Sequence, residues 1–278
     1  MKRASVLLLH GLCSTPDELL PVDTALRAAG HDVQGLCVPG YSFEVGVGKQ
    51  RATPFSQWLQ VVAQAAARLH EGGRPVVLVG LSAGASLALG AAMLGVAPID
   101  GLVLMSTTLQ FDGWSVPRHH VLMPLALYTP LGRFWQYRER PPYGVKNPRV
   151  RRWIERELAA RQVSCAGAAV IGVDHLREHD RLRRHVRRSL ASFDCPPVLA
   201  LHARDDELAS LANVELLQQG LRARSFRAVV LPDSHHMITI DNDRQQVVRE
   251  TVQFVESLAL VPASTPLAGE VAHEPAYV

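Results

Sequence analysis

The chain contains several short runs of consecutive apolar residues, separated by longer stretches of mixed character. These runs do not alternate with polar positions, and unbroken apolarity is typical of parallel strands that are buried on both faces. A weaker run over His31–Val38 fits the same series. The predicted strands are otherwise Val6–Leu9, Val76–Val79, Leu102–Met105, Val198–Leu201 and Ala228–Leu231. The pattern therefore predicts a sheet of about six strands.

Stretches with helical character lie between these runs. Phe55–His70 shows it most clearly, because Pro54 precedes it and Gly72 and Gly73 follow it. The other predicted helices are Glu18–Ala29, Ser82–Leu94, Leu208–Gln219 and Gln245–Leu258. Alternation of strand and helix predicts an α/β fold with a doubly wound, mostly parallel sheet.

One connection is far longer than the others. No strand is evident from Thr107 to Pro196, whereas strand–helix connections usually have about 2–6 residues. Apolar residues spaced by four within Leu176–Leu190 predict the crossover helix that this connection needs. The residues that remain, about Leu109–Val173, are interpreted as a helical insertion.

The predicted organisation is an α/β core of residues 1–108 and 174–260, a cap of residues 109–173 and a disordered tail of residues 261–278. The tail contains three prolines and many small residues. Because open α/β sheets bind ligands at their carboxyl edge, we expect the cap to cover that edge. Leu125 and Leu127 are its candidate substrate contacts. The alternative is a helical lobe that binds nothing.

Composition narrows the class of protein only a little. A length of 278 residues fits one α/β domain with an insertion, and the net charge of +3 is too small to indicate nucleic acid or membrane by itself. The apolar stretch after Lys2 and Arg3 is too short for a signal peptide, and no run could span a bilayer. The four cysteines are scattered without metal-ligand spacing. We therefore expect a cytoplasmic protein with free thiols.

The segment Gly80–Gly84, with the sequence Gly-Leu-Ser-Ala-Gly, carries the main chemical signal. A G-x-S-x-G pattern alone occurs often by chance. Here it follows a predicted strand and begins a predicted helix, which is the context of a nucleophile on a sharp turn. Glycines suit the flanking positions because the backbone is crowded there. Ser82 is therefore the candidate nucleophile.

A serine nucleophile needs a base that a third group orients. In α/β folds that carry such a serine turn, these residues follow one another along the chain in the order serine, acid, histidine. Asp205 and Asp206 follow one predicted strand, and His235 and His236 follow the last. All four lie past the carboxyl ends of strands, so they are expected at the same edge as the serine. The residues alone do not separate either pair of neighbours. Asp112 is a third candidate for the acid.

Hydrolysis through a serine also needs N–H donors for the oxyanion, and these usually come from the backbone. One is expected from Ala83, directly after the nucleophile. The other is expected from the turn after the first strand, at His10-Gly11-Leu12.

Four segments resemble the bacterial carboxylesterase and monoacylglycerol lipase branch of the α/β-hydrolase superfamily: Leu7–Gly11, Gly80–Gly84, Ala203–Leu208 and Ser234–Asp241. The resemblance covers about Val6–Leu258 and is weakest in the cap. It implies that Asp206 is the acid, because the family's acid precedes Glu or a similar residue and then an apolar position. It implies His236 as the base, because the family's histidine lies five residues before an aspartate. It also places the oxyanion donors on Leu12 and Ala83.

The chain departs from this branch at several positions. Gly40-Tyr41-Ser42 stands where Gly-His-Gly is common, Ala83 stands where Met or Leu is frequent, and the cap is longer and richer in arginine. The arginines between positions 133 and 188 have two interpretations: a rim that attracts anions, or solvated helix faces. We favour solvated faces, because acidic residues alternate with them. These departures bear on the substrate more than on the reaction.

The activity favoured by these residues is that of a serine hydrolase that cleaves carboxylic esters through an acyl-enzyme, and the apolar cap favours an uncharged acyl chain, short to medium or from a monoacylglycerol. This activity implies no cofactor, no metal and no partner beyond a small-molecule ester. A thioesterase or acyltransferase would use the same triad, and a catalytically silent binding protein is the alternative from another class. Ser82 at the turn excludes dehalogenase and epoxide hydrolase chemistry, which requires a carboxylate nucleophile. The oligomeric state stays open.

Overall fold

A computed structural model of the chain describes residues 3–43, 51–130, 132, 135–161, 163–164 and 166–260. The predicted tail, residues 261–278, lies outside the described residues. No helix within the described ranges is both long and apolar enough to cross a bilayer.

Six strands form one sheet, and every pair of neighbouring strands in it is parallel. In spatial order the strands are β12 (Phe226–Leu231), β10 (Val198–Ala203), β4 (Gly101–Met105), β3 (Val76–Leu81), β1 (Ser5–Leu9) and β2 (Asp32–Gly35). The α/β fold class predicted from the apolar runs is confirmed. The four inner strands are buried on both faces as expected: in β1, Leu7 and Leu9 pack into one hydrophobic cluster, while Val6 and Leu8 pack into the other. The edge strands β2 and β12 are largely exposed, which was not expected.

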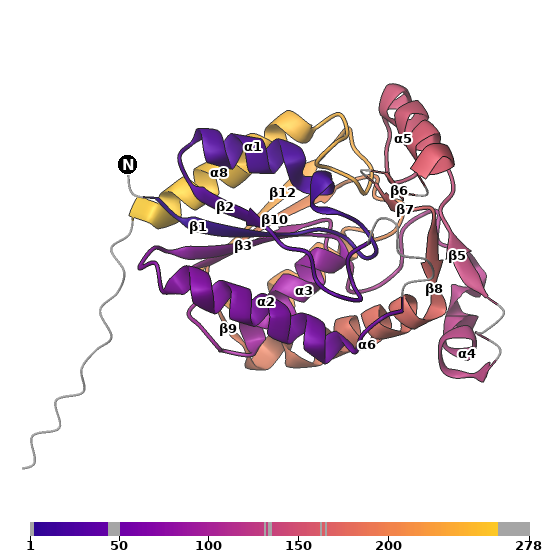
Figure 1. The fold of residues 1–278 in the computed structure, drawn as a ribbon, viewed down its shortest axis with the longest axis horizontal. Helices are drawn as coiled ribbons and strands as arrows, with labels where there is room; N and C mark the ends of the chain where they lie inside the picture. The colour runs from indigo at the N-terminus through magenta and orange to yellow at the C-terminus, as the bar shows by residue number, and fades with distance from the viewer. Residues whose placement is uncertain are drawn as a thin grey trace, which may run out of the picture.

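Helices cover both faces of the sheet (Figure 1). Helices α1 (Leu20–Ala28) and α8 (Arg244–Leu260) lie together on one face. Helices α2 (Phe55–His70), α3 (Ala83–Met93) and α6 (Val173–Ser189) lie on the other. The predicted crossover helix Leu176–Leu190 is α6, which begins three residues earlier.

The strand order reverses at β1. The chain places β2 on one side of β1 and then crosses to place β3 on the other side. In open α/β sheets the crevice beyond the carboxyl ends of the strands at such a reversal is the usual ligand site. The turns after β1 and β3 meet at this crevice, and they hold the candidate oxyanion donor Leu12 and the candidate nucleophile Ser82.

The segment between β4 and α6, which contains most of residues 109–173, lies beyond one end of the sheet (Figure 1). Its elements are η2 (Arg118–Leu122), α4 (Met123–Tyr128), β5 (Gln136–Arg138), α5 (Pro148–Arg161), β6 (Val163–Ser164), β7 (Gly167–Ala168) and β8 (Val170–Gly172). Strand β5 pairs with β8 and β6 with β7, both antiparallel. The expectation of no strand between Thr107 and Pro196 was wrong, because strands of two or three partly exposed residues leave no apolar run.

Some element boundaries also differ from those expected. A 3₁₀ turn, η1 (Pro16–Leu19), precedes α1, and β2 is shorter than His31–Val38. The helix expected from Leu208 begins at Ala212 as α7 (Ala212–Gly220). The backbone N–H groups of Leu208 and Ala209 instead donate to the Asp206 carboxylate at 2.9 Å each, so a side chain holds this stretch in a turn.

Two further short strands flank the crossover. Strand β9 (Asp194–Cys195) pairs in parallel with β11 (Arg222–Ala223), and these two strands directly precede β10 and β12 in the chain. A 3₁₀ turn, η4 (Leu190–Ser192), connects α6 to β9.

Candidate active site

Ser82 lies on a sharp turn between β3 and α3. Its backbone has φ of 57° and ψ of −119°, a conformation that costs a non-glycine residue of the order of 1–3 kcal/mol. The Ser82 N–H donates to the Met105 carbonyl of the neighbouring strand at 2.8 Å, and this hydrogen bond helps to hold the turn. The predicted strand–turn–helix context is therefore present.

The two glycines of the motif are required by close backbone packing. A Cβ atom on Gly80 would lie 2.3 Å from the Gly84 carbonyl oxygen, and one on Gly84 would lie 2.2 Å from the Leu9 carbonyl oxygen. Both distances are far below van der Waals contact with atoms that cannot move aside. The motif's spacing thus reflects the space available under the turn.

Gly84→Ala is accordingly expected to destabilise the fold by about 3 kcal/mol or more, because the new methyl group collides with strand β1. Urea unfolding of the purified variant measures this. Gly95→Ala is the matched control: Gly95 has φ of +64° and no atom within 4 Å of an added Cβ. It should cost only about 1 kcal/mol for the left-handed conformation. Equal losses in the two variants would contradict the packing explanation.

His236, Asp206 and Ser82 form one continuous hydrogen-bonded chain. His236 Nε2 lies 2.8 Å from Ser82 Oγ, and His236 Nδ1 lies 2.8 Å and 3.0 Å from the two Asp206 carboxylate oxygens. Asp206 and His236 are buried, at 2% and 3% exposure. Residues 82, 206 and 236 come from three separate loops, and the fold brings them together in the arrangement by which a base activates a serine.

The same geometry distinguishes the neighbours that the residues alone left open. Asp205 pairs with Lys146 at 3.3 Å, and its backbone carbonyl contacts His235 Nδ1 at 2.9 Å. Among the described residues, neither Asp205 nor His235 forms a hydrogen bond with Ser82. They form a second, outer layer beside the serine–histidine–aspartate chain.

The third candidate acid, Asp112, is placed elsewhere. Its carboxylate accepts from the Ser210 backbone at 2.8 Å and from the Asn213 side chain at 3.0 Å. These contacts tie the loop after β4 to the start of α7 and leave Asp112 out of hydrogen-bond contact with His236.

The two proposed oxyanion amides are free donors. Within the described part of the chain, neither the Leu12 N–H nor the Ala83 N–H donates a hydrogen bond to protein. The amides beside them are occupied: Gly11 N–H binds Glu18 Oε2 at 2.6 Å, and Cys13 N–H binds the Tyr41 carbonyl at 3.0 Å. Two unoccupied N–H groups at the turns after β1 and β3 match what a developing oxyanion requires.

A family model described as the alpha/beta hydrolase family matches residues 6–250, which is most of the chain. The chain belongs to this family. The superfamily resemblance inferred from the motifs is confirmed.

This alpha/beta hydrolase is 24% identical over 259 residues to a thermostable monoacylglycerol lipase from a Bacillus species, covering 90% of this chain and 89% of that one. Its fold is similar to a soluble variant of monoglyceride lipase from Saccharomyces cerevisiae, with a TM-score of 0.74 and 15% identity over 92% of this chain and 87% of that one. It is also similar to the monoacylglycerol lipase of Paleococcus ferrophilus, with a TM-score of 0.71 and 19% identity over 93% and 98% of the two chains.

Two buried glutamates near the hydrolase's candidate triad were missed by sequence reasoning. Glu207 Oε2 accepts from the His236 backbone N–H at 3.1 Å, and Glu18 accepts from Gly11 as described above. Burial raises the pKa of Glu18 to about 7 and also raises the pKa of Glu207. No sequence signal marked Glu18, which reads as an ordinary exposed residue at the start of a helix. Glu207 was noted only as the residue after the acid.

Tyr41 and Ser42, which stand where related carboxylesterases commonly have histidine and glycine, also have structural roles. His10 Nε2 lies 2.7 Å from Ser42 Oγ, and the Tyr41 hydroxyl donates to the His10 carbonyl at 2.6 Å. Burial lowers the pKa of His10 to about 4, so its ring is neutral at pH 7. This network fixes the turn that carries Leu12.

Asp241 is the aspartate five residues after His236 that the family resemblance used to identify the base. It is fully buried, and its carboxylate accepts hydrogen bonds from three backbone N–H groups. It accepts from Lys146 at 2.7 Å, from Asn147 at 2.9 Å and from His235 at 2.9 Å. It therefore ties the β4–α6 segment to the histidine loop.

The two candidate substrate contacts on α4 occupy different environments. Leu127 is 1% exposed and lines a cavity between α4 and α6, whereas Leu125 is 54% exposed. No described group of three or more His, Cys, Asp or Glu residues could hold a metal ion.

Proposed function

We propose that this chain hydrolyses carboxylic esters through an acyl-enzyme. Ser82 is the nucleophile, His236 the general base and acid, and Asp206 the group that orients the imidazole. The N–H groups of Leu12 and Ala83 stabilise the oxyanion. The observation that carries the proposal is the unbroken chain of hydrogen bonds from Ser82 Oγ through His236 to Asp206.

The proposed steps conserve atoms and protons. Ser82 Oγ bonds to the ester carbonyl carbon while its proton passes to His236 Nε2. The tetrahedral intermediate collapses, the bond to the alcohol oxygen breaks, and His236 returns the proton to that oxygen. Water then repeats the sequence on the acyl-enzyme and releases the carboxylic acid. Asp206 stays ionised: burial alone would raise its pKa, but the charge of His236 and several hydrogen bonds lower it.

Esters of short to medium acyl chains and monoacylglycerols are the proposed substrates. The support is the similarity to a monoacylglycerol lipase over nine-tenths of the chain. A panel of p-nitrophenyl esters, a monoacylglycerol and an acyl thioester tests the class directly. Faster turnover of the thioester than of every ester would favour a thioesterase, and absence of both turnover and fluorophosphonate labelling would favour a silent binding protein.

Ester turnover is expected to rise with pH up to about pH 9. Burial alone would lower the pKa of His236, but the charge and hydrogen bond of Asp206, with the charges of Glu207 and Glu18, raise that pKa to about 9. The base must be neutral to accept the serine proton, so kcat/KM at pH 7 should lie about a hundredfold below its plateau. A pH profile of kcat/KM, corrected for spontaneous hydrolysis, measures this.

Glu207→Gln should move the rising limb of this profile to lower pH, because it removes one negative charge that favours protonated His236. Asp205→Asn is the matched control: it removes a neighbouring carboxylate that is not among the groups that raise the pKa of His236. The same displacement in both variants would show that the limb does not report His236.

We further propose that residues 109–173 act as the cap of this site and that residues 1–108 and 174–260 form the core. Three contacts support the placement. Ala168 N–H donates to the Cys13 carbonyl at 3.1 Å, Trp114 Nε1 donates to the Asp205 carbonyl at 3.0 Å, and Met237 N–H donates to the Gly144 carbonyl at 2.7 Å. The cap thus touches the loops after β1, β10 and β12, all of which belong to the site.

If Leu125 and Leu127 contact the acyl chain, polar substitutions there should penalise long esters more than short ones. Each buried CH₂ contributes about 0.8 kcal/mol, so Leu127→Asn should lower the hexanoate-to-acetate ratio of kcat/KM by about tenfold. Val96→Asn is the control, because Val96 is 56% exposed and precedes β4 at the opposite end of the sheet. Unchanged ratios in folded Leu125 and Leu127 variants would exclude these residues from the acyl pocket.

A further inference from the structure

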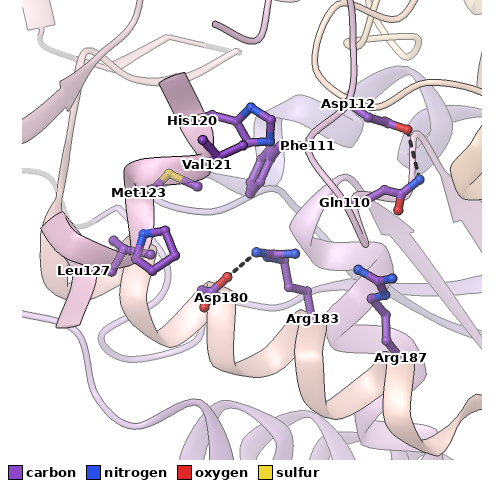
Figure 2. A pocket seen from close by; sticks show the side chains of 11 residues that line it. Gln110, Phe111, Asp112, His120, Val121, Met123, Leu127, Asp180, Arg183 and Arg187 are labelled. Atoms are coloured by element: carbon purple, nitrogen blue, oxygen red, sulfur yellow. Dashed lines mark hydrogen bonds and ion pairs between the residues drawn. The ribbon is translucent and has the colours of Figure 1, made fainter. Parts of the chain in front are cut away.

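A cavity of about 370 Å³ lies between the cap and α6 (Figure 2). Its lining is divided in character. Met123, Val121 and Leu127 of η2 and α4 form an apolar wall, while Arg183 and Arg187 of α6 point into it from the other side. Ser82, Asp206 and His236 do not line it. Its volume lies within the range of about 300–1,000 Å³ that is usual for small-molecule sites.

The arginine side of this cavity has hydrogen-bonding capacity that the protein does not use. Arg183 has a side chain only 15% exposed. Its Nη1 donates to the Leu109 carbonyl at 3.2 Å and its Nη2 pairs with Asp180, while its buried Nε has no partner among the described residues. An unpaired buried donor costs about 1–3 kcal/mol. Arg187 lies one helical turn further on and forms no ion pair within the described part of the chain.

The acidic residues that line the same cavity do not cancel this charge. Asp180 pairs with Arg183 and is also 2.9 Å from Arg184 Nε, so Arg184 supplies a matching charge from outside the lining. The Tyr128 hydroxyl also donates to Asp180 at 2.7 Å.

Asp112, the other acid in the lining, is saturated by neutral donors. It accepts from Ser210 N, Ser210 Oγ, Asn213 Nδ2 and Gln110 Nε2 at 2.7–3.0 Å. With Arg184 counted, Arg183, Arg184 and Arg187 face only two carboxylates, those of Asp180 and Asp112, so the cavity and its immediate surroundings keep one positive charge.

We propose that this cavity binds an aliphatic carboxylate, with the carboxylate against Arg183 and Arg187 and the hydrocarbon chain along Met123 and Leu127. The planar guanidinium group can donate two parallel hydrogen bonds to a carboxylate. A small inorganic anion would leave the apolar side chains on the opposite side exposed to water. An aliphatic chain of several CH₂ groups gains binding free energy by burying its surface against these side chains, and acetate is too short to do so.

Titration calorimetry of the full chain with octanoate, octanol and acetate tests this. Octanoate should bind more tightly than either octanol, which lacks the charge, or acetate, which lacks the chain. Arg187→Gln should weaken octanoate binding by about tenfold, the loss of one charge-assisted hydrogen bond. Arg188→Gln is the matched control, because Arg188 is the adjacent exposed arginine on α6 and does not line the cavity. Arg188→Gln should leave the affinity unchanged.

A second variant addresses the chain-binding wall. Met123→Gln should weaken octanoate more than acetate, whereas Leu122→Gln, on the exposed η2 residue that precedes Met123 and lies outside the lining, should not. Equal binding of octanol and octanoate, or equal effects of the Arg187 and Arg188 substitutions, would overturn the proposal. These calorimetric measurements use no ester, so their outcome does not depend on whether the chain hydrolyses esters.

Two sources of an aliphatic carboxylate are chemically equivalent at this cavity: a free fatty acid, and the far end of a dicarboxylic half ester. Hydrolysis of monomethyl suberate and of methyl octanoate distinguishes them. If the substrate supplies the carboxylate, Arg187→Gln lowers turnover of the half ester and spares methyl octanoate. If a free acid supplies it, Arg187→Gln spares both esters while calorimetry still shows the weaker octanoate binding.

Discussion

Replacing Ser82 with alanine is expected to lower ester turnover by about 10⁴–10⁶-fold and to abolish fluorophosphonate labelling. The hydroxyl is the only atom group removed, and the strained backbone at φ 57° tolerates alanine no worse than serine. The remaining turnover would come from the two free amides, Leu12 and Ala83, and from substrate binding. Turnover of a short p-nitrophenyl ester, with thermal unfolding as a check on the fold, measures the effect.

Ser86→Ala is the matched control for this substitution. Ser86 lies on the first turns of α3, is fully buried, and donates to the Thr108 carbonyl at 3.2 Å. Its loss should reduce stability by about 1 kcal/mol and leave the labelling intact. Turnover within about tenfold of the wild type in a clean Ser82→Ala preparation would remove Ser82 from the mechanism.

The second large effect separates adjacent residues. Asp206→Asn should lower kcat by about 10⁴-fold, because the amide cannot hold His236 in the tautomer that accepts the serine proton. His236→Ala should cost at least as much. The same substitutions at Asp205 and His235 should cost little, since these residues contact Lys146 and the backbone instead of Ser82.

Steady-state kinetics of the four single variants measures this contrast. Asp205 also pairs with Lys146 next to Asp233, so unfolding curves should accompany the rates to separate a loss of structure from a loss of function. Equal or reversed losses within either pair would refute the assignment of Asp206 or His236.

Much of the fold was readable from local sequence. Five apolar runs predicted five strands of the sheet. Four of them, β1, β3, β4 and β10, are buried on both faces, where polar side chains are rarely tolerated, while the edge strand β12 is apolar but largely exposed. Helix α2 was predicted with its observed limits because Pro54 and the glycine pair mark its ends. The motif Gly80–Gly84 predicted the sharp turn, since only glycine leaves room for the backbone that crosses under Ser82.

The short strands of the β4–α6 segment left no such signal. Strands β5 and β8 contain three residues each, their residues are partly exposed, and their pairing joins positions about thirty residues apart. Two or three residues cannot display a period, so only the folded chain shows that they pair.

The sequence by itself determined the order of the candidate catalytic residues along the chain: a serine on a glycine-flanked turn, then an acid, then a histidine, each after a strand of the sheet. The chemistry of the residues left each pair of neighbours open, and the spacing shared with the family favoured Asp206 and His236. The tertiary structure adds the contacts: His236 Nε2 meets Ser82 Oγ and His236 Nδ1 meets Asp206, because consecutive positions in a loop point in different directions. It also placed Glu18 and Glu207 near His236 and set Arg183 and Arg187 opposite the apolar side chains of η2 and α4. These groups meet across distances that no local pattern records, and their charges act through space rather than along the chain.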